Sequence, residues 1–269
     1  MSKALYAILA LIACAASVAL VVLGVFGSPE TLGSIRELGR FVLLSTFNVF
    51  SKRWWAGSPE AVTAVLWDYR GIDTVFETTV LYAAIAGCVA LGYAGLRKPA
   101  SEGRKEGRGL GEGLTLVVRA ATKILFALIL ITSLNVALHG YITPGGGFAG
   151  GSTFAIAPLL IIAAYSTNAM VRRGFSFLRS SALRSAGLVG LALVVLTPLL
   201  YYGFVLQNQA KPGSPFPGYP AFLGPLFLGG SLIYLNLAEF LVVGMEFIMV
   251  FILFHVLDRV LGGGGHGER

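Results

Sequence analysis

The stretch YITPGGGFAGGS, residues 141–152, places five glycines and a proline between two long apolar runs. Gly145, Gly147 and Gly150 satisfy the G-x-G-x-x-G spacing that seats a dinucleotide pyrophosphate. Such a site requires a β-strand before the glycines, a helix after them and an acidic residue about 20 positions further on. Here an apolar helix is predicted before the glycines, and the stretch contains no Lys or Arg. The sequence therefore argues against a nucleotide site.

Close helix packing is the physical alternative. Gly146 with Gly150, and Gly147 with Gly151, form overlapping small-xxx-small pairs, which allow a membrane helix to approach the backbone of a neighbour. Pro144 suits the first turn of such a helix, where its missing N–H costs nothing. We therefore expect these residues to begin a membrane helix that packs against partners, with unwound backbone lining a cavity as a further possibility.

The composition on both sides of this stretch is that of an integral membrane protein. Of the 269 residues, 56% are hydrophobic and 12% are charged, and the mean hydropathy is +0.79. A spanning helix needs about 20 apolar residues. We predict an all-α integral membrane protein with about six transmembrane helices, near residues 4–26, 74–96, 116–138, 150–170, 183–206 and 232–257. The first run resembles a signal peptide, but it continues well past Cys14, which favours a retained helix.

The connecting segments indicate orientation and partners. With these six spans, 14 of the 20 Lys and Arg residues lie on the side that carries both termini. The positive-inside rule predicts a multi-pass protein of the cell membrane with both termini in the cytoplasm. The net charge of +7 then reflects topology and attraction to anionic lipid, with no nucleic acid required. Between the first two spans, residues 31–72 predict helices lying at the outer interface, where Trp54, Trp55 and Trp67 favour the headgroup level.

Cysteine and glycine usage bound the remaining possibilities. Cys14 and Cys88 both fall inside predicted spans and no C-x-x-C pair occurs, so we expect no metal centre and no cofactor in this chain. Residues 100–113 are polar and glycine-rich and predict a cytoplasmic linker between a two-span module (1–99) and a four-span module (114–258). Residues 259–269 are expected to form a disordered Gly-rich tail.

Two motifs resemble a known family. PGGGFAGG at residues 144–151 resembles the signature of the MrpB-like (MnhB) subunit of multisubunit Na+/H+ antiporters, which recurs in Mrp-type modules of membrane-bound hydrogenases and sulfane reductases. AVTAVLWDYRGIDTVFETTVL at residues 61–81 is similar to the carboxyl-terminal module of MrpA, which stands as a small separate subunit in the hydrogenase-type complexes. The resemblance implies that the chain fuses these two modules.

Acidic residues cluster at the start of the second predicted span. Asp73 and Glu77 are four residues apart and share one helix face. Helix capping, with Arg70 pairing Asp68 or Asp73, is the structural interpretation for Asp73. Glu77 lies deeper, where a carboxylate is costly unless it is paired, protonated or facing water. The resemblance implies that this acidic position belongs to the cation pathway.

Further ion-pathway candidates lie on other spans. Glu239 and Glu246 are seven residues apart on one face of the last span, in line with Asn236, and either relay ions or bind partner subunits. His139 stands just before the glycines and either exchanges protons or makes a structural hydrogen bond. Lys123 at the other end of that span either ends a polar path or extends to lipid headgroups.

These features predict a non-catalytic membrane subunit of a cation/proton-translocating complex, which contributes to the ion pathway and to assembly. The implied partners are large antiporter-like and small Mrp-type subunits, hydrogenase or other redox subunits, Na+ or H+, and the lipid bilayer. The alternative is a structural scaffold in a membrane-bound hydrogenase or sulfur-reducing complex, without a direct role in ion relay. A membrane enzyme is disfavoured because no D-D-x-x-D, H-x-x-x-x-D or G-x-S-x-G pattern occurs.

Overall fold

The computed structural model describes residues 11–12, 14–16, 18–20, 35–48, 54–96, 115–219 and 229–262. Its regular elements in these ranges are helices, which confirms the prediction of an all-α protein, and the only strand-like pairing described is a single bridge between Gln209 and Gly218. The chain divides into two compact units, Met1–Leu44 and Ser45–Arg269. In the first unit, the described residues between 11 and 20 are helical. Most of the predicted first span at 4–26 lies outside the described residues, as do the linker at 100–113 and residues 263–269 of the predicted tail. The prediction that the disordered tail begins at residue 259 was wrong, because residues 259–262 still belong to the last helix.

Five helices in the described ranges are long and apolar enough to cross a membrane, in agreement with five of the six predicted spans. They are α4 (Gly71–Leu96), α5 (Leu116–His139), α6 (Gly147–Ala164), α8 (Phe177–Leu196, continued by a 3-10 turn at Thr197–Tyr201) and α9 (Ser231–Gly262).

Two predicted boundaries were wrong by six residues. α6 ends at Ala164 instead of residue 170, because Ser166 accepts a hydrogen bond from the Ala169 N–H and begins a separate helix, α7 (Thr167–Arg172). α8 begins at Phe177 instead of residue 183, because the Ser176 side chain caps it by accepting from the Arg179 N–H.

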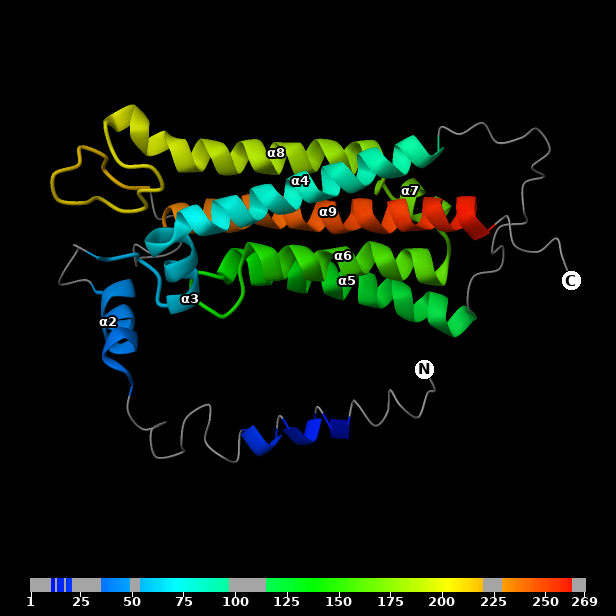
Figure 1. Ribbon diagram of the computed structural model, residues 1–269, viewed down its shortest axis with the longest axis horizontal. Coiled ribbons are helices and arrows are strands. Elements are labelled where there is room, and N and C mark those ends of the chain that lie inside the picture. The colour runs from blue at the N-terminus through cyan, green and yellow to red at the C-terminus, as the bar shows by residue number, and fades with distance from the viewer. Residues whose placement is uncertain are drawn as a thin grey trace, which may run out of the picture. The chain divides into compact units, whose positions relative to one another are not determined.

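α9 is the central helix of the second unit (Figure 1). It packs against α4, α6 and α8, and α5 covers α6. Within its apolar span, 67% of α9 is buried, against 17% for α4 and for α5. A helix that is apolar on all sides is expected to be enclosed by others. The few polar side chains of α9 are therefore held inside the bundle.

The glycine stretch forms a loop followed by the first turns of α6. Gly145 and Gly146 have φ of +155° and +127°, conformations that side-chain-bearing residues rarely adopt. Pro144 lies in this loop and not in the first helical turn as predicted, because α6 begins only at Gly147. We call the end of the bundle that carries residues 140–147 the loop end.

The predicted small-residue packing involves both neighbours of α6. A Cβ added at Gly151 would lie 2.9 Å from the Phe240 carbonyl oxygen of α9, and one added at Gly150 would lie 2.8 Å from the Ser133 carbonyl oxygen of α5. α6 therefore contacts the backbone of two helices at once, which a larger side chain at either position would prevent.

The segment before α4 folds onto the glycine loop. It contains α3 (Ala61–Ala64) and a π-helical turn at Val65–Tyr69, and Glu60 caps α3 with its carboxylate. The Ser58 hydroxyl donates to the Tyr141 carbonyl at 2.5 Å, and the Thr63 hydroxyl donates to the Gly140 carbonyl at 2.6 Å. These bonds satisfy carbonyls at the end of α5. The expectation that Trp67 lies at the lipid headgroups was wrong: it is 2% exposed, while Trp54 is 50% exposed.

Candidate functional site: a carboxylate pocket at the glycine loop

A pocket of about 250 Å³ lies at the loop end of the bundle. Three parts of the chain that are distant in sequence form it: the segment 63–77, the glycine loop and α9. Its lining combines two carboxylates, two threonines, an asparagine and loop backbone with apolar walls; the residues are Thr63, Leu66, Trp67, Thr74, Glu77, Gly145, Gly146, Gly147, Phe148, Asn236 and Glu239.

Glu239 is the buried carboxylate of the pocket, with 5% of its surface exposed. Its Oε2 accepts a hydrogen bond of 3.0 Å from the backbone N–H of Phe148, in the first turn of α6. The first N–H groups of a helix have no partner within the helix, and this end carries a partial positive charge. α6 thus offers the carboxylate both a donor and a favourable field.

The glycine at position 147 makes this contact possible. A Cβ there would lie 2.6 Å from both Cβ and Oε2 of Glu239, and closer still to the Asn236 backbone oxygen. A side chain at Gly147 would push the start of α6 away from α9. The glycines therefore bring backbone donors to a carboxylate inside the bundle.

Asn236 joins the pocket walls one turn before Glu239. Its Oδ1 accepts from the indole Nε1 of Trp67 at 2.9 Å and from the backbone N–H of Gly147 at 3.4 Å. Its side-chain Nδ2 is buried and has no hydrogen-bond partner among the described residues. The sequence placed Asn236 on the polar stripe of the last span, but it gave no signal for the contact with Trp67.

Glu77 is the second carboxylate of the pocket, and it comes from α4. The Glu77 side chain is exposed, and its negative charge repels that of Glu239. The Thr78 hydroxyl, next to Glu77 in the sequence, lies close to the Glu239 carboxylate. Asp73, one turn earlier, does not line the pocket. It forms a 2.5 Å ion pair with Arg70, and its side chain is 60% exposed, which fits the capping interpretation.

The remaining candidates lie apart from the pocket. His139 is exposed, and its Nδ1 contacts the Asn135 carbonyl oxygen of its own helix at 3.1 Å. Lys123 is exposed on α5, near the opposite end of that helix. Glu246 is fully buried further along α9. Of the six predicted ion-pathway side chains, the fold brings Glu77 and Glu239 together at one pocket.

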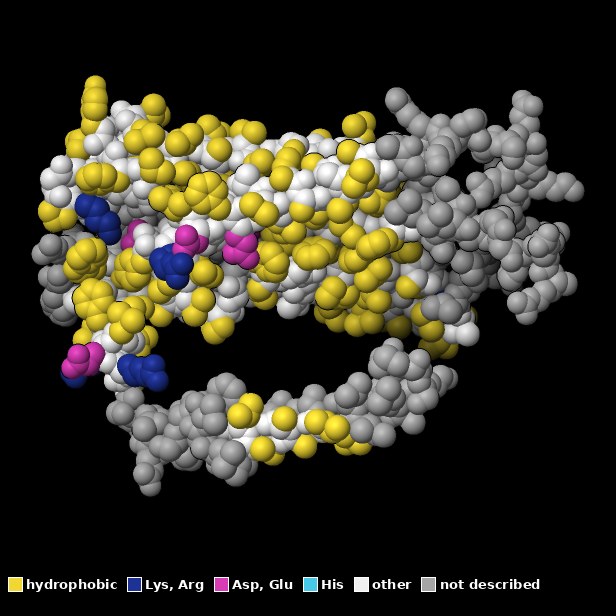
Figure 2. Space-filling model, in the orientation of Figure 1, with side chains coloured by type: hydrophobic (Ala, Val, Ile, Leu, Met, Phe, Trp, Pro, Cys, Tyr) yellow, Lys and Arg dark blue, Asp and Glu magenta, His cyan; other side chains and the backbone are white. Residues whose placement is uncertain are grey.

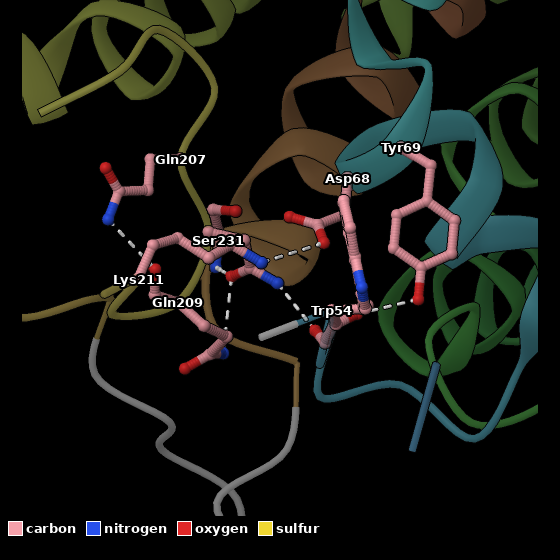
Figure 3. A network of polar contacts seen from close by, with 9 residues as sticks. Trp54, Asp68, Tyr69, Gln207, Gln209, Lys211 and Ser231 are labelled. Carbon is pink, nitrogen blue, oxygen red and sulfur yellow. Dashed lines mark hydrogen bonds and ion pairs between the residues drawn. The ribbon is translucent and has the colours of Figure 1, made fainter. Parts of the chain in front are cut away.

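A polar network beside the pocket was not predicted (Figure 3). Asp68, with a 4% exposed side chain, lies 3.6 Å from Lys211 Nζ, and the Asn208 backbone also hydrogen-bonds it. Burial raises the pKa of Asp68 to about 6, although Lys211 opposes the rise. Asn208 in turn donates to the Ala56 carbonyl and accepts from the Ser231 N–H. The network ties the loop after α8 to the segments that precede α4 and α9.

The loop end of the bundle carries charged side chains and many oxygen atoms that can bind a cation. On the face drawn in Figure 2, the acidic and basic side chains of the bundle gather at the loop end, and the coloured surface of the bundle beyond them is largely apolar. No group of three or more His, Cys, Asp or Glu suited to a metal ion occurs within the described ranges. The pocket offers carboxylate, hydroxyl, amide and carbonyl oxygens, which suit a proton, water or a hard cation.

This chain resembles a known protein in sequence and chains of known membrane complexes in structure. A protein of Methanocaldococcus jannaschii described as uncharacterized is 28% identical over 192 residues, which is 67% of this chain and 71% of that protein. A chain of the membrane-bound sulfane sulfur reductase, an archaeal respiratory membrane complex, aligns with a TM-score of 0.60 and 26% identity, over 94% of this chain and 98% of its own length. A chain of the Mrp complex from Dietzia sp. DQ12-45-1b has a TM-score of 0.60 and 21% identity, over 100% of this chain and 27% of its own, and at that identity supports the fold alone.

A family of domains related to the MnhB subunit of the Na+/H+ antiporter matches residues 117–249. The matched residues include the PGGGFAGG loop, α6, α8, nearly all of α5 and the part of α9 that carries Glu239 and Glu246. Residues 117–249 therefore form a domain related to the MnhB subunit of the Na+/H+ antiporter.

Proposed function

We propose that this chain is a non-catalytic membrane subunit of a multisubunit, Mrp-type cation/proton-translocating complex, and that Glu77 and Glu239 form a cation-handling site within it. The observation that carries the proposal is the pocket itself. One carboxylate from the segment similar to MrpA and one from the MnhB-related domain line the same cavity, beside the glycine loop.

The geometry supports reversible binding of one positive charge. Two neighbouring carboxylates disfavour the doubly ionised state, so a shared proton or a cation relieves their repulsion. Glu239 is held in place by the Phe148 N–H, whereas Glu77 is exposed and free to exchange. At about 30 Å³ per water molecule in the liquid, the cavity has room for several waters. The oxygens of Thr63 and Thr74 add ligands for a partly hydrated ion.

We also propose the two-module division and the orientation. Residues 1–99 act as the MrpA-like module and residues 114–258 as the MrpB-like module, joined by a cytoplasmic linker at 100–113. The similarity of 94% of this chain to 98% of one sulfane reductase chain supports both modules standing in a single subunit. With both termini cytoplasmic, the loop end faces outward and the pocket meets the external medium.

A scaffold is the second candidate function, and the exposed spans favour it. α4 and α5 are each only 17% buried within their apolar windows, so both have broad surfaces for other membrane subunits or lipid. In this case the carboxylates hold the loop and the helices in register without passing ions. Both functions place the chain in the same assembly but predict different behaviour of Glu77.

The test is Glu77→Gln and Glu239→Gln in the native complex, with Asp73→Asn as the matched control. Asp73 is a carboxylate one turn away on the same helix, but it is ion-paired outside the pocket. Co-purification of partner subunits measures assembly, and Na+-dependent proton movement in sealed vesicles measures translocation. We expect all three variants to assemble, with translocation reduced about tenfold or more in the two glutamine variants only. Wild-type translocation in both would leave the scaffold as the function.

A further inference from the structure

Basic side chains gather at the end of the bundle opposite the loop end, where α7 lies (Figure 1). Residues 113–238 contain seven Lys and Arg and no Asp or Glu. Arg184 is buried within the bundle, and Lys211 lies at the loop end beside Asp68. The five others stand near the start of α5, in or just after α7 and in the first turn of α8: Arg119, Lys123, Arg172, Arg173 and Arg179.

The ring of Tyr165 is the fixed point of this end. Tyr165 follows the last residue of α6, and its hydroxyl donates to the Arg119 carbonyl oxygen of α5 at 2.8 Å. The ring is half-buried and packs against the buried cluster that includes Met170 of α7 and Ile248 of α9. Contacts from four helices therefore hold it in place.

Two guanidinium groups stack on this ring. The Cζ of Arg173 lies 4.8 Å from the ring centre, and the Cζ of Arg119 lies 5.8 Å from it. These two distances add to 10.6 Å, so the two positive charges are no further apart than that. Stacking uses the flat face of a guanidinium and leaves the N–H donors at its edge available. Arg173 is exposed, so its edge is accessible from outside the bundle.

A third guanidinium lies beside the residue that follows Arg173. A Cβ added at Gly174 would be 3.3 Å from Nη1 of Arg179, so the Arg179 side chain lies against the backbone of the turn between α7 and α8. Gly174 has a φ of +102°, which suits glycine in such a turn. Arg173 and Arg179 form no ion pair within the described ranges. Because guanidinium groups stay protonated, a bound anion is what relieves their mutual repulsion.

The neighbouring apolar side chains indicate the depth of this cluster. Val171 is 44% exposed and Leu178 is 78% exposed, and each is within two residues of an exposed arginine. The membrane span α6 ends here and the span α8 begins here. Exposed apolar and basic side chains alternate in this way where a protein passes from the acyl chains to the lipid headgroups.

We propose that Arg119, Arg173 and Arg179, arranged around Tyr165, bind the phosphodiester of an anionic phospholipid. Arginine is suited to this ligand, because its planar donors match two oxygens of a phosphate at once. The acyl chains of the same molecule would lie in the lipid around Val171 and Leu178. The proposal does not depend on ion handling by Glu77 and Glu239. In the proposed orientation, this end faces the cytoplasmic leaflet, whose anionic lipids attract basic segments.

The test measures lipid binding to the purified full chain in dodecylmaltoside micelles by native mass spectrometry. The added lipid is dioleoylphosphatidylglycerol, which is anionic, or dioleoylphosphatidylcholine, which has the same phosphodiester but no net charge. We expect the wild type to bind phosphatidylglycerol more tightly. Arg173→Gln should lower the apparent affinity for it about tenfold, because a charge-assisted contact with the phosphate is lost.

Arg172→Gln is the matched control. Arg172 is exposed, is adjacent to Arg173 and has the same charge, but among the described residues only Arg119 and Arg173 stack on Tyr165. Its removal should change the affinity less than about twofold, as expected for an exposed charge outside the site. Tyr165→Leu removes the ring on which Arg173 stacks and should weaken binding as Arg173→Gln does. Circular dichroism verifies that each variant is folded.

Four results would overturn the proposal. Equal losses of affinity in Arg172→Gln and Arg173→Gln would show a diffuse attraction to surface charge instead of a site. Equal binding of the two lipids by the wild type would exclude recognition of an anionic lipid. Displacement of the bound lipid by an excess of inorganic phosphate would assign the site to a free anion. Wild-type affinity in folded Tyr165→Leu would show that the ring does not organise the arginines.

Discussion

Replacing Gly151 by Ala tests whether the glycines of α6 are there for backbone contact with α9. The added methyl carbon would lie 2.9 Å from the Phe240 carbonyl oxygen, 2.9 Å from the Gly244 nitrogen and 3.0 Å from Cβ of Val243. A Cβ in ordinary van der Waals contact lies 3.4–4 Å from its neighbours, so each of these contacts is too short by about 0.4 Å or more. Two of the three atoms belong to the α9 backbone and cannot rotate away. α6 and α9 would have to separate.

The expected cost follows from this overlap. Overpacking of this kind destabilises by about 1–3 kcal/mol. Alanine also favours a helix over glycine by about 1 kcal/mol, which works in the opposite direction. Gly87 of α4 supplies the matched control, because it also lies within a membrane helix but a Cβ there would meet nothing within 4 Å. Gly87→Ala therefore reports the helix-propensity gain alone.

The assay is unfolding of the purified full chain in dodecylmaltoside micelles by increasing sodium dodecyl sulfate, followed by circular dichroism. Gly151→Ala should be less stable than Gly87→Ala by about 1–3 kcal/mol, a factor of about 5–150 in the folding equilibrium. Equal stability of the two variants would refute the argument. The glycines would then have to be explained by the loop conformation alone.

Two further predictions use the same unfolding assay. Because folded Asp68 has a pKa of about 6, above its ordinary 3.8, it holds its proton more tightly than the unfolded chain does, and its stabilising contribution is lost as pH rises from about 4 to about 6. Asp68→Asn should therefore remove about 3 kcal/mol of pH dependence from this interval. A pH profile of stability identical to that of the wild type would contradict the assignment. Asn236→Leu should cost about 2–5 kcal/mol, since it leaves the buried Trp67 N–H and Gly147 N–H without their acceptor, and a smaller cost of the same change in a Trp67→Phe background identifies the indole contact.

The fold class and the two carboxylates of the pocket could be predicted from the sequence. Hydropathy predicted five of the spans because a membrane helix must be long and apolar, whatever it packs against. Glu77 and Glu239 stood out because each is a carboxylate within an apolar run. That both line one pocket was not predictable, because it depends on the register between α4 and α9, and hydropathy has no information on register.

The loop residues show the same limit. Trp67 was predicted at the interface because an indole ring is amphipathic and tryptophan favours that depth. Its N–H instead meets Asn236, which is far away along the chain, and hydrogen bonds from Ser58 and Thr63 to the end of α5 hold its segment over the bundle. The choice between headgroup and core was made by those tertiary contacts, which composition does not reveal.

Arg184 was missed through an error of one boundary. With the span assigned to 183–206, Arg184 fell at its edge and was counted with the connecting charges. The Ser176 cap begins α8 at Phe177, which moves Arg184 about two turns into the helix. The same residue then changes from a topological signal to a buried charge that needs a partner. The residue that caps a membrane helix sets where the helix begins, and so which charged side chains lie inside it and need a buried partner.

The glycine motif and Glu239, which the sequence presents as separate features, are physically one arrangement. A carboxylate inside a membrane bundle requires donors, and α9 has none to offer, because its backbone N–H groups at that depth are used by its own helix. The first N–H groups of α6 have no partner within their own helix, and they reach the Glu239 carboxylate only because Gly147 has no Cβ between the two helices. A side chain at Gly147 would therefore disturb Glu239 as directly as a change to Glu239 itself, although the motif contains no ionisable side chain.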